Sequence, residues 1–187
     1  MNKKFQRWFT ASCLITTTTL LACHNPSPAH YDVLIQGGSI VDGSGGPAYA
    51  ADIAIVGDKI VEVGDLEGAT ATSIIDASGQ VVSPGFIDLH THADRNIRDN
   101  PGVENYLFQG VTTMLMGNCG NSPVDLHEYF QSVEEIGIAP NMAMLIGHNA
   151  VRAEVMGNDN RAPTDDELAG MRELVKAAMD AGAFGMS

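Results

Sequence analysis

Cysteine is scarce in this chain, and its placement excludes a fold stapled by disulfides. The 187 residues contain 3 cysteines, Cys13, Cys23 and Cys119. The first two belong to an N-terminal stretch with the pattern of an export signal, so Cys119 has no partner for an internal disulfide. A lone thiol in an oxidising compartment is a liability unless it is buried or bound to a metal.

Basic and aromatic residues are also few. Lysine and arginine total 10 against 23 aspartates and glutamates, which gives a formal net charge of −13. Proteins that bind the phosphate backbone need clustered Lys and Arg, so we expect no nucleic acid among the partners. Aromatic residues make up 6% of the chain and glycines number 20, a balance that suits a loop-rich α/β protein.

The N-terminus has the features of a bacterial lipoprotein signal. Three basic residues precede an apolar stretch, residues 14–22, which is too short to span a bilayer as a mature helix. The stretch ends in Leu20-Leu21-Ala22-Cys23, which resembles a lipobox, where the cysteine is acylated and becomes the first mature residue. A plain signal peptide or an uncleaved anchor is the alternative. We predict a signal over residues 1–23, a tether over 24–30, and a membrane lipoprotein that faces the periplasm.

The next part of the sequence is rich in short apolar segments separated by turn residues. Residues 53–56 and 59–63 flank Gly57-Asp58, a pattern typical of a β-hairpin. Several strands at such close spacing predict a small β-sandwich over residues 31–84.

From residue 85 to residue 187, predicted strands alternate with predicted helices. This alternation indicates βα units and a parallel sheet. Thr164 and Glu167 have capping-box spacing, which predicts a helix start. A (β/α) barrel needs eight strands and typically ~250 residues, so we expect the first half of a barrel and interpret the chain as an N-terminal fragment. The predicted strands are 86–90, 111–116, 141–146 and a fourth from 183, and the predicted helices are 103–109, 124–136 and one from 164 to Gly182.

The strongest chemical signal is Asp88-Leu89-His90-Thr91-His92, at the end of the first of these strands. Side chains two residues apart on a strand share a face, so Asp88, His90 and His92 are expected to point the same way. At the carboxyl end of a barrel strand, that direction faces the active-site mouth. Two neutral imidazoles there can bind one divalent cation. The alternative is a pair of polar loop histidines.

Residues 76–92 closely resemble the signature of the amidohydrolase superfamily, which joins a β-sandwich to a metal-bearing (β/α) barrel. Residues 110–120, ending in Gly117-Asn118-Cys119-Gly120, resemble the D-aminoacylase (N-acyl-D-amino-acid deacylase) branch. The resemblance implies Zn²⁺ as the cofactor, with Cys119 as a ligand beside His90 and His92. Thiolate is a strong zinc ligand, whereas the competing interpretation is a small thiol buried in the core.

Residues 147–152 and 182–187 are similar to the same branch. We place His148 at the end of the third strand, where it could orient a ligand, touch substrate or serve as a hydrogen-bonded structural histidine. Arg152 could meet a substrate carboxylate in a bidentate way or form a structural ion pair. Asp88 completes the set of residues predicted to support the ligands or contact substrate.

The resemblance implies a zinc-dependent enzyme that hydrolyses N-acyl-D-amino acids to a carboxylate and a D-amino acid. Its general acid/base aspartate and two further histidine ligands are expected beyond residue 187, so we expect the 187 residues alone to be inactive and poorly folded. Two alternatives stay open: a cyclic-amide hydrolase of the dihydropyrimidinase or dihydroorotase type, and a non-catalytic truncated lipoprotein.

Overall fold

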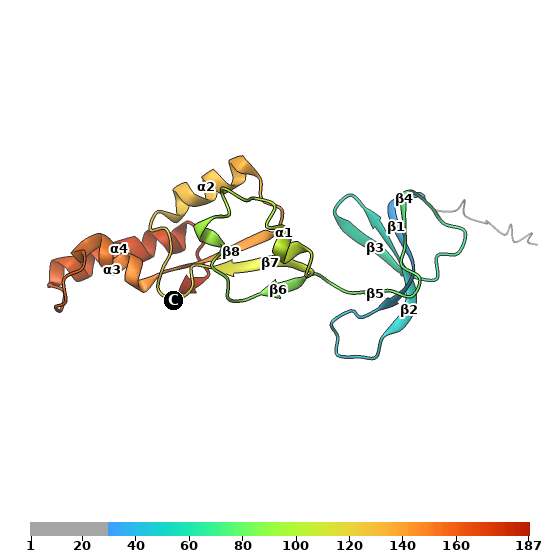
Figure 1. Ribbon diagram of the computed structural model, residues 1–187, viewed down its shortest axis with the longest axis horizontal. Helices are drawn as coiled ribbons and strands as arrows, with labels where there is room; N and C mark the ends of the chain where they lie inside the picture. The colour runs from blue at the N-terminus through green and yellow to red at the C-terminus, as the bar shows by residue number, and fades with distance from the viewer. Residues whose placement is uncertain (1–29) are drawn as a thin grey trace, which may run out of the picture. The chain divides into compact units, whose positions relative to one another are not determined.

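The computed structural model describes residues 30–187 (Figure 1). The described chain divides into two compact units, one formed by residues 30–40 and 49–81 and the other by residues 41–48 and 82–187. The predicted signal with Cys23, and the predicted tether up to residue 29, lie outside the described residues. Among the helices that are described, none has the length and apolar character needed to cross a membrane.

The first unit is built on one β-sheet. Its strand order is β3-β2-β1-β4, with β5 paired to β1, so these residues form a single sheet, and the predicted two-layer sandwich stays a prediction. β1 runs antiparallel to β2 and parallel to β4. The strands are β1 (His30–Ile40), β2 (Tyr49–Val56), β3 (Lys59–Gly64), β4 (Thr70–Asp76) and β5 (Val81–Val82).

The predicted hairpin at Gly57-Asp58 is confirmed, since these two residues join β2 to β3. Gly57 has a φ of 60°, which glycine adopts without steric cost, and its N–H donates to the carboxylate of Asp32 at 2.7 Å. A small apolar core lies beneath the sheet, where Leu34 and Ala54 are fully buried.

The second unit contains the predicted parallel sheet. Its strands follow the order β6-β7-β8-β9, and every adjacent pair is parallel. Helices α3 and α4 lie alongside each other and pack together (Figure 1). The strands are β6 (Phe86–Asp88), β7 (Val111–Met116), β8 (Asn141–Ile146) and β9 (Gly185–Met186); the helices are the 3-10 turn η1 (Ala93–Arg95), α1 (Glu104–Leu107), α2 (Leu126–Ile136), α3 (His148–Met156) and α4 (Asp165–Asp180).

The core of this unit forms where the two central strands meet the helices. Met114 and Met116 on β7, and Met144 and Ile146 on β8, have no exposed surface. They alternate along each strand with less buried residues, because successive side chains point to opposite faces of a sheet. Val133 of α2 packs into the same cluster. Burial of these side chains fixes the register of β7 and β8.

The predicted capping box of α4 is confirmed. The Thr164 hydroxyl accepts the N–H of Glu167 at 3.2 Å, and the Glu167 carboxylate accepts the N–H of Thr164 at 2.7 Å. Arg161 donates to both carboxylate oxygens of Glu167, at 2.8 and 2.6 Å. These hydrogen bonds hold the pKa of Glu167 down at about 2, and the Arg161 guanidinium is the main cause.

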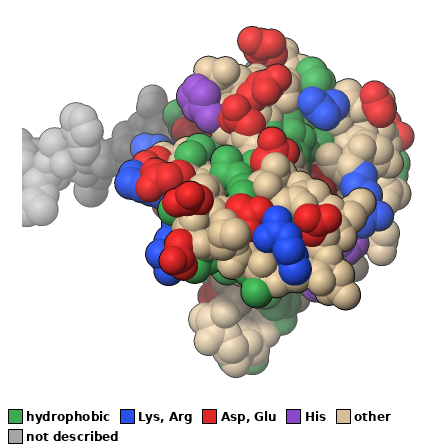
Figure 2. Space-filling model, turned by 90° about the vertical axis from the view of Figure 1, so that its left-hand side faces the viewer, with side chains coloured by type: hydrophobic (Ala, Val, Ile, Leu, Met, Phe, Trp, Pro, Cys, Tyr) green, Lys and Arg blue, Asp and Glu red, His purple; other side chains and the backbone are tan. Residues whose placement is uncertain are grey.

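Acidic side chains are spread over the face seen in Figure 2, with basic side chains between them.

Two predicted features of this unit are corrected. The first strand ends at Asp88 instead of residue 90, because the Asp88 carboxylate accepts the N–H of His90 at 3.0 Å and turns the chain out of the sheet. His148 does not end the third strand; it is the first residue of α3, a helix that the sequence analysis missed. That helix starts after Gly147 without a capping side chain, so its start carries no sequence signal.

Candidate metal centre

Three side chains that can bind a metal come together at one edge of the parallel sheet. Ligand atoms of His90, His92 and Cys119 all lie within 4.8 Å of one another. The Cys119 sulfur is 3.3 Å from Nε2 of His90. The two imidazole rings have their centroids 5.5 Å apart and meet edge to face at 74°. Within residues 30–187, no other group of three His, Cys, Asp or Glu side chains converges in this way.

Parallel pairing of β6 and β7 explains why these residues meet. Asp88 is paired with Met114, so the loops that follow the two strands leave the sheet at the same edge. Beyond Asp88 the histidines are on a loop, and the alternation of a strand no longer sets their directions. The loop is fixed to β7 instead, because Thr91 donates its N–H to the carbonyl of Leu115 at 3.1 Å.

The loop that carries Cys119 has an unusual backbone. Cys119 has a φ of 58°, between Gly117 at 78° and Gly120 at 75°. The left-handed region costs a non-glycine residue about 1–2 kcal/mol, so neighbouring contacts must hold it. Ser187 provides two of them: its hydroxyl donates to the carbonyl of Gly117 at 2.7 Å and accepts the N–H of Gly120 at 3.0 Å.

The cluster is open to solvent. His90 and Cys119 are exposed and His92 is partly buried. Exposure of the Cys119 side chain does not fit the alternative of a thiol buried in the core. An ion and a water molecule can therefore reach these three donors.

The donor set fits a soft divalent cation. Two imidazoles and one thiol are the ligand types that zinc prefers, and catalytic zinc sites ordinarily take three protein ligands. Ligands about 2.0–2.3 Å from a tetrahedral ion lie about 3.5 Å from each other. The 3.3 Å between the Cys119 sulfur and the His90 nitrogen is close to that spacing.

The other predicted residues are placed outside this cluster. Asp88 supports the histidine loop through the N–H of His90. His148 is exposed at the start of α3 and donates its backbone N–H to the carbonyl of Ser187 at 3.0 Å. The Arg152 guanidinium donates to the carbonyls of Asp159 and Arg161, at 2.6 and 2.8 Å, so it holds the loop after α3. Among residues 30–187, Arg152 forms no ion pair with an acidic side chain, and its contact with a substrate carboxylate stays a prediction.

Two residues near the cluster carry no signal in the sequence that marks them as part of the site. Asn118 is buried, and its side-chain amide donates to the backbone carbonyls of Thr91 in the histidine loop and of Leu115 in β7. Ser187, which directly follows β9, contacts the cysteine loop although it lies 70 residues along the chain from Gly117. The Gly-Asn-Cys-Gly segment drew attention to Cys119 alone, because nothing in a sequence indicates which backbone carbonyl an amide will meet.

Tyr129 connects helix α2 to the segment that follows His92. Its hydroxyl donates to the backbone carbonyl of Asp94 at 3.1 Å, and the guanidinium of Arg98 lies 5.4 Å from the centre of its ring. Burial raises the pKa of Tyr129 to about 12, and the nearby Asp94 charge adds to the shift while Arg98 opposes it. The hydroxyl is therefore a neutral donor at physiological pH.

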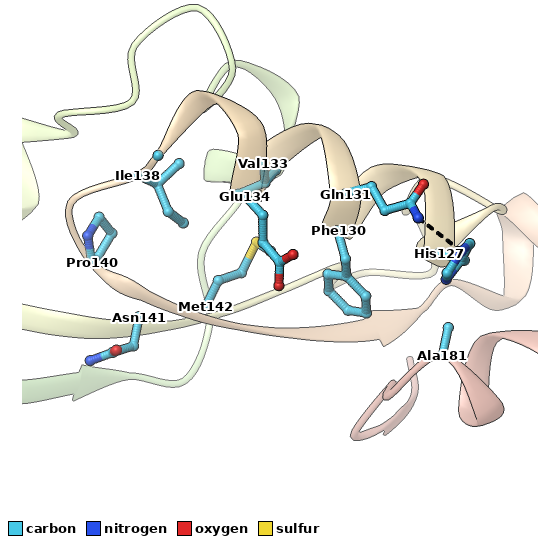
Figure 3. A pocket seen from close by; sticks show the side chains of 11 residues that line it. His127, Phe130, Gln131, Val133, Glu134, Ile138, Pro140, Asn141, Met142 and Ala181 are labelled. Atoms are coloured by element: carbon cyan, nitrogen blue, oxygen red, sulfur yellow. Dashed lines mark hydrogen bonds between the residues drawn. The ribbon is translucent and has the colours of Figure 1, made fainter.

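A separate hollow of about 710 Å³ lies between α2 and β8, away from the three donors (Figure 3). Phe130 and Met142 give it apolar walls, and Glu134 adds an acid. His127, on the exposed side of α2, lies within hydrogen-bonding distance of Gln131, at 3.1 Å. The side chains that line this hollow include no group of metal ligands that converge on one point. We therefore assign the candidate metal site to the edge of the parallel sheet, at His90, His92 and Cys119.

Comparison with known proteins agrees with the geometry. A profile described as "Amidohydrolase family" matches residues 73–187, a range that contains all three donors. The chain belongs to the amidohydrolase family. The parallel sheet is accordingly the first part of an amidohydrolase barrel, as the sequence predicted.

The sequence of this amidohydrolase is similar to those of proteins that are named for action on N-acyl-D-amino acids. A D-aminoacylase of Alcaligenes xylosoxydans xylosoxydans is 39% identical over 84% of the chain, and an N-acyl-D-aspartate deacylase of the same organism is 38% identical over 86%. The chain spans 37% of the length of each of these relatives.

A solved structure shows the same arrangement of elements. N-acyl-D-glutamate deacylase from Bordetella bronchiseptica, complexed with zinc and a phosphonate inhibitor, superposes with a TM-score of 0.80 at 33% identity. The match covers 84% of this chain and 38% of that structure's chain. The predicted place within the D-aminoacylase branch is confirmed.

Proposed function

We propose that the full-length protein hydrolyses the amide bond of N-acyl-D-amino acids with the help of bound zinc, releasing a carboxylate and a D-amino acid. One observation carries this proposal: His90, His92 and Cys119 gather within 4.8 Å at the rim of the sheet. Support comes from relatives at 39 and 38% identity that bear deacylase names and from a structural neighbour that holds zinc.

In this proposal the three side chains are the ligands of the zinc ion. Each imidazole offers one neutral nitrogen, and Cys119 offers a thiolate whose negative charge favours zinc over Mg²⁺ or Ca²⁺. Zinc bound there would polarise the acyl carbonyl and lower the pKa of a bound water to about 7. Asp88 keeps the His90 backbone in place, so the imidazole is presented in a fixed direction.

The residue that exchanges protons with water and the leaving amine is not assigned among residues 30–187. We expect an aspartate from the last strand of the barrel to take this role. Two further histidines on later strands, which the family resemblance implies, would complete the set of metal ligands. The general acid/base must lie within hydrogen-bonding reach of both the attacking water and the amide nitrogen.

We also propose that the protein is exported and anchored to the membrane by a lipid on Cys23. Labelling cells with a radioactive fatty acid tests this directly. The wild-type protein should carry the label and fractionate with membranes, whereas the Cys23→Ser variant should lose both properties. Label retained by Cys23→Ser would contradict the assignment.

Activity is tested on the purified full-length protein with three substrates. We expect hydrolysis of N-acetyl-D-methionine, little of N-acetyl-L-methionine, and little of hydantoin, which represents the cyclic amides. Removal of the metal with a chelator should abolish the activity, and added zinc should restore it. Preference for hydantoin, or activity that survives complete removal of the metal, would overturn the proposal.

A further inference from the structure

Asn118 occupies an unusual position beside the three donors. In the part of the chain that the structure describes, two polar side chains are buried, Thr91 at 3% exposure and Asn118 at 6%. Thr91 lies between His90 and His92, and Asn118 directly precedes Cys119. The two buried polar residues are therefore each adjacent in sequence to a proposed ligand.

These two residues are joined by a hydrogen bond. The side-chain amide of Asn118 donates to the carbonyl of Thr91 at 3.2 Å and to the carbonyl of Leu115 at 2.9 Å. Leu115 also accepts the N–H of Thr91, at 3.1 Å. The amide thus connects the cysteine loop, the histidine loop and the end of β7 at one point.

The chemistry of the amide leaves one way to orient it. Both partners are carbonyl oxygens, so the NH₂ group, which has two donors, must face them. A carboxylate of the same shape has no proton to donate and would place negative charge against both carbonyls. A side chain without hydrogen-bond donors would leave the buried carbonyl of Thr91 without the hydrogen bond that Asn118 provides.

The backbone of the cysteine loop needs such a restraint. Cys119 holds a φ of 58°, a conformation that a side chain with a Cβ avoids unless its surroundings impose it. Ser187 fixes the loop from β9 through Gly117 and Gly120. Asn118 is the side chain that fixes it to the histidine loop.

The geometry points to Asn118 as a positioning residue that sets the distance between the Cys119 sulfur and the two imidazoles, so that the three donors are arranged before an ion arrives. This inference rests on the proposed metal centre and adds a residue to it. Partners that orient metal ligands commonly change metal affinity by about 10–100-fold when they are removed.

The test compares zinc affinity and cobalt spectra in the full-length protein. Asn118→Ala removes the amide. Asn141→Ala is the matched control, because Asn141 also donates to a backbone carbonyl, that of Thr112 at 3.1 Å, but at the opposite end of the strands. Val133→Ala controls for lost stability, since Val133 is buried in α2 at 3% exposure and outside both loops.

We expect Asn118→Ala to raise the zinc dissociation constant, measured against a competing chelator, by about 10–100-fold. With cobalt in place of zinc, its ligand-field bands should also change, because the angle between sulfur and nitrogen donors is no longer fixed. Both controls should bind zinc within about twofold of the wild type. If Asn118→Ala does not fold, Asn118→Ser, which keeps a small polar side chain, should show the same change in affinity.

Wild-type affinity and an unchanged cobalt spectrum in the Asn118 variant would overturn the positioning role while leaving the proposed centre intact. An equal loss of affinity in Val133→Ala would also overturn it, because the effect would then follow from stability. If the spectrum of the cobalt-loaded wild type lacks a thiolate-to-cobalt band, the proposed metal centre itself is wrong.

Discussion

The sulfur of Cys119 lies 3.3 Å from Nε2 of His90, although 29 residues separate them in the chain. Parallel pairing of β6 and β7 produces this closeness, because both strands end at the same edge of the sheet. Hydrogen bonds from the backbone of Thr91 and the side chain of Asn118 then fix the loops that carry the two donors. The candidate centre is therefore a product of strand order and loop hydrogen bonding together.

The first prediction concerns the histidines. His90→Asn should reduce both bound zinc and deacylation, because an amide is a far weaker zinc ligand than imidazole. Zinc content after dialysis and the rate on N-acetyl-D-methionine measure the two effects. His127→Asn is the control, since His127 is an exposed histidine on α2 outside the cluster. A His90 variant that retains full zinc and full activity would contradict the assignment.

The second prediction concerns the close approach of Gly117 to β8. A Cβ on Gly117 would lie 2.1 Å from the carbonyl oxygen of Leu145, whereas a Cβ on Gly137 would meet nothing within 4 Å. Both glycines have positive φ, 78° and 74°, so both alanine variants carry backbone strain at the substituted residue. Gly117→Ala should lose a further about 1–3 kcal/mol from the steric clash.

Urea unfolding of the two variants separates the clash from the strain. The Gly117 variant should also bind zinc more weakly, since the clash displaces the loop two residues before Cys119. Equal losses of stability in the two variants would show that β7 and β8 do not approach as described.

The third prediction concerns the start of α4 and its dependence on pH. The pKa of Glu167 is about 2 in the folded chain, below its ordinary value of 4.5, mainly because Arg161 donates to its carboxylate. A lowered folded pKa means that the stabilisation is complete above about 4.5 and is lost as the pH falls toward about 2. Glu167→Gln removes the charge and retains an acceptor for the N–H of Thr164.

The difference in urea midpoint between wild type and Glu167→Gln should therefore be largest above pH 4.5 and should vanish near pH 2. Glu154→Gln is the control, because Glu154 is an exposed acid of α3 without a salt bridge among the described residues. A difference that grows as the pH falls would contradict the ion pair.

Much of the second unit could be predicted because its signals are local. β7 and β8 have the predicted bounds, since short apolar segments with alternating buried Met and Ile are flanked by glycine or proline. The capping box of α4 depends on two residues three positions apart, Thr164 and Glu167. Cys119 was grouped with His90 because of the resemblance to the D-aminoacylase branch, and the shared edge at which parallel strands end explains why the two residues meet.

The parts that could not be predicted depend on contacts between distant residues. Asn118 bonds to a carbonyl 27 residues away and Ser187 to one 70 residues away, and neither partner is marked by its residue type. Helix α3 begins without a capping side chain, so His148 was assigned to a strand end. The early end of β6 depends on the side chain of Asp88 accepting a backbone N–H, which competes with strand pairing.

We propose that one ion is shared by nitrogen donors of the histidine loop and the sulfur of Cys119. X-ray absorption at the zinc edge, recorded on the full-length protein loaded with one equivalent of zinc, tests it most directly. We predict one sulfur at about 2.3 Å beside nitrogen ligands at about 2.0–2.1 Å, and loss of the sulfur shell in Cys119→Ser. A wild-type spectrum with only nitrogen and oxygen ligands would contradict the account.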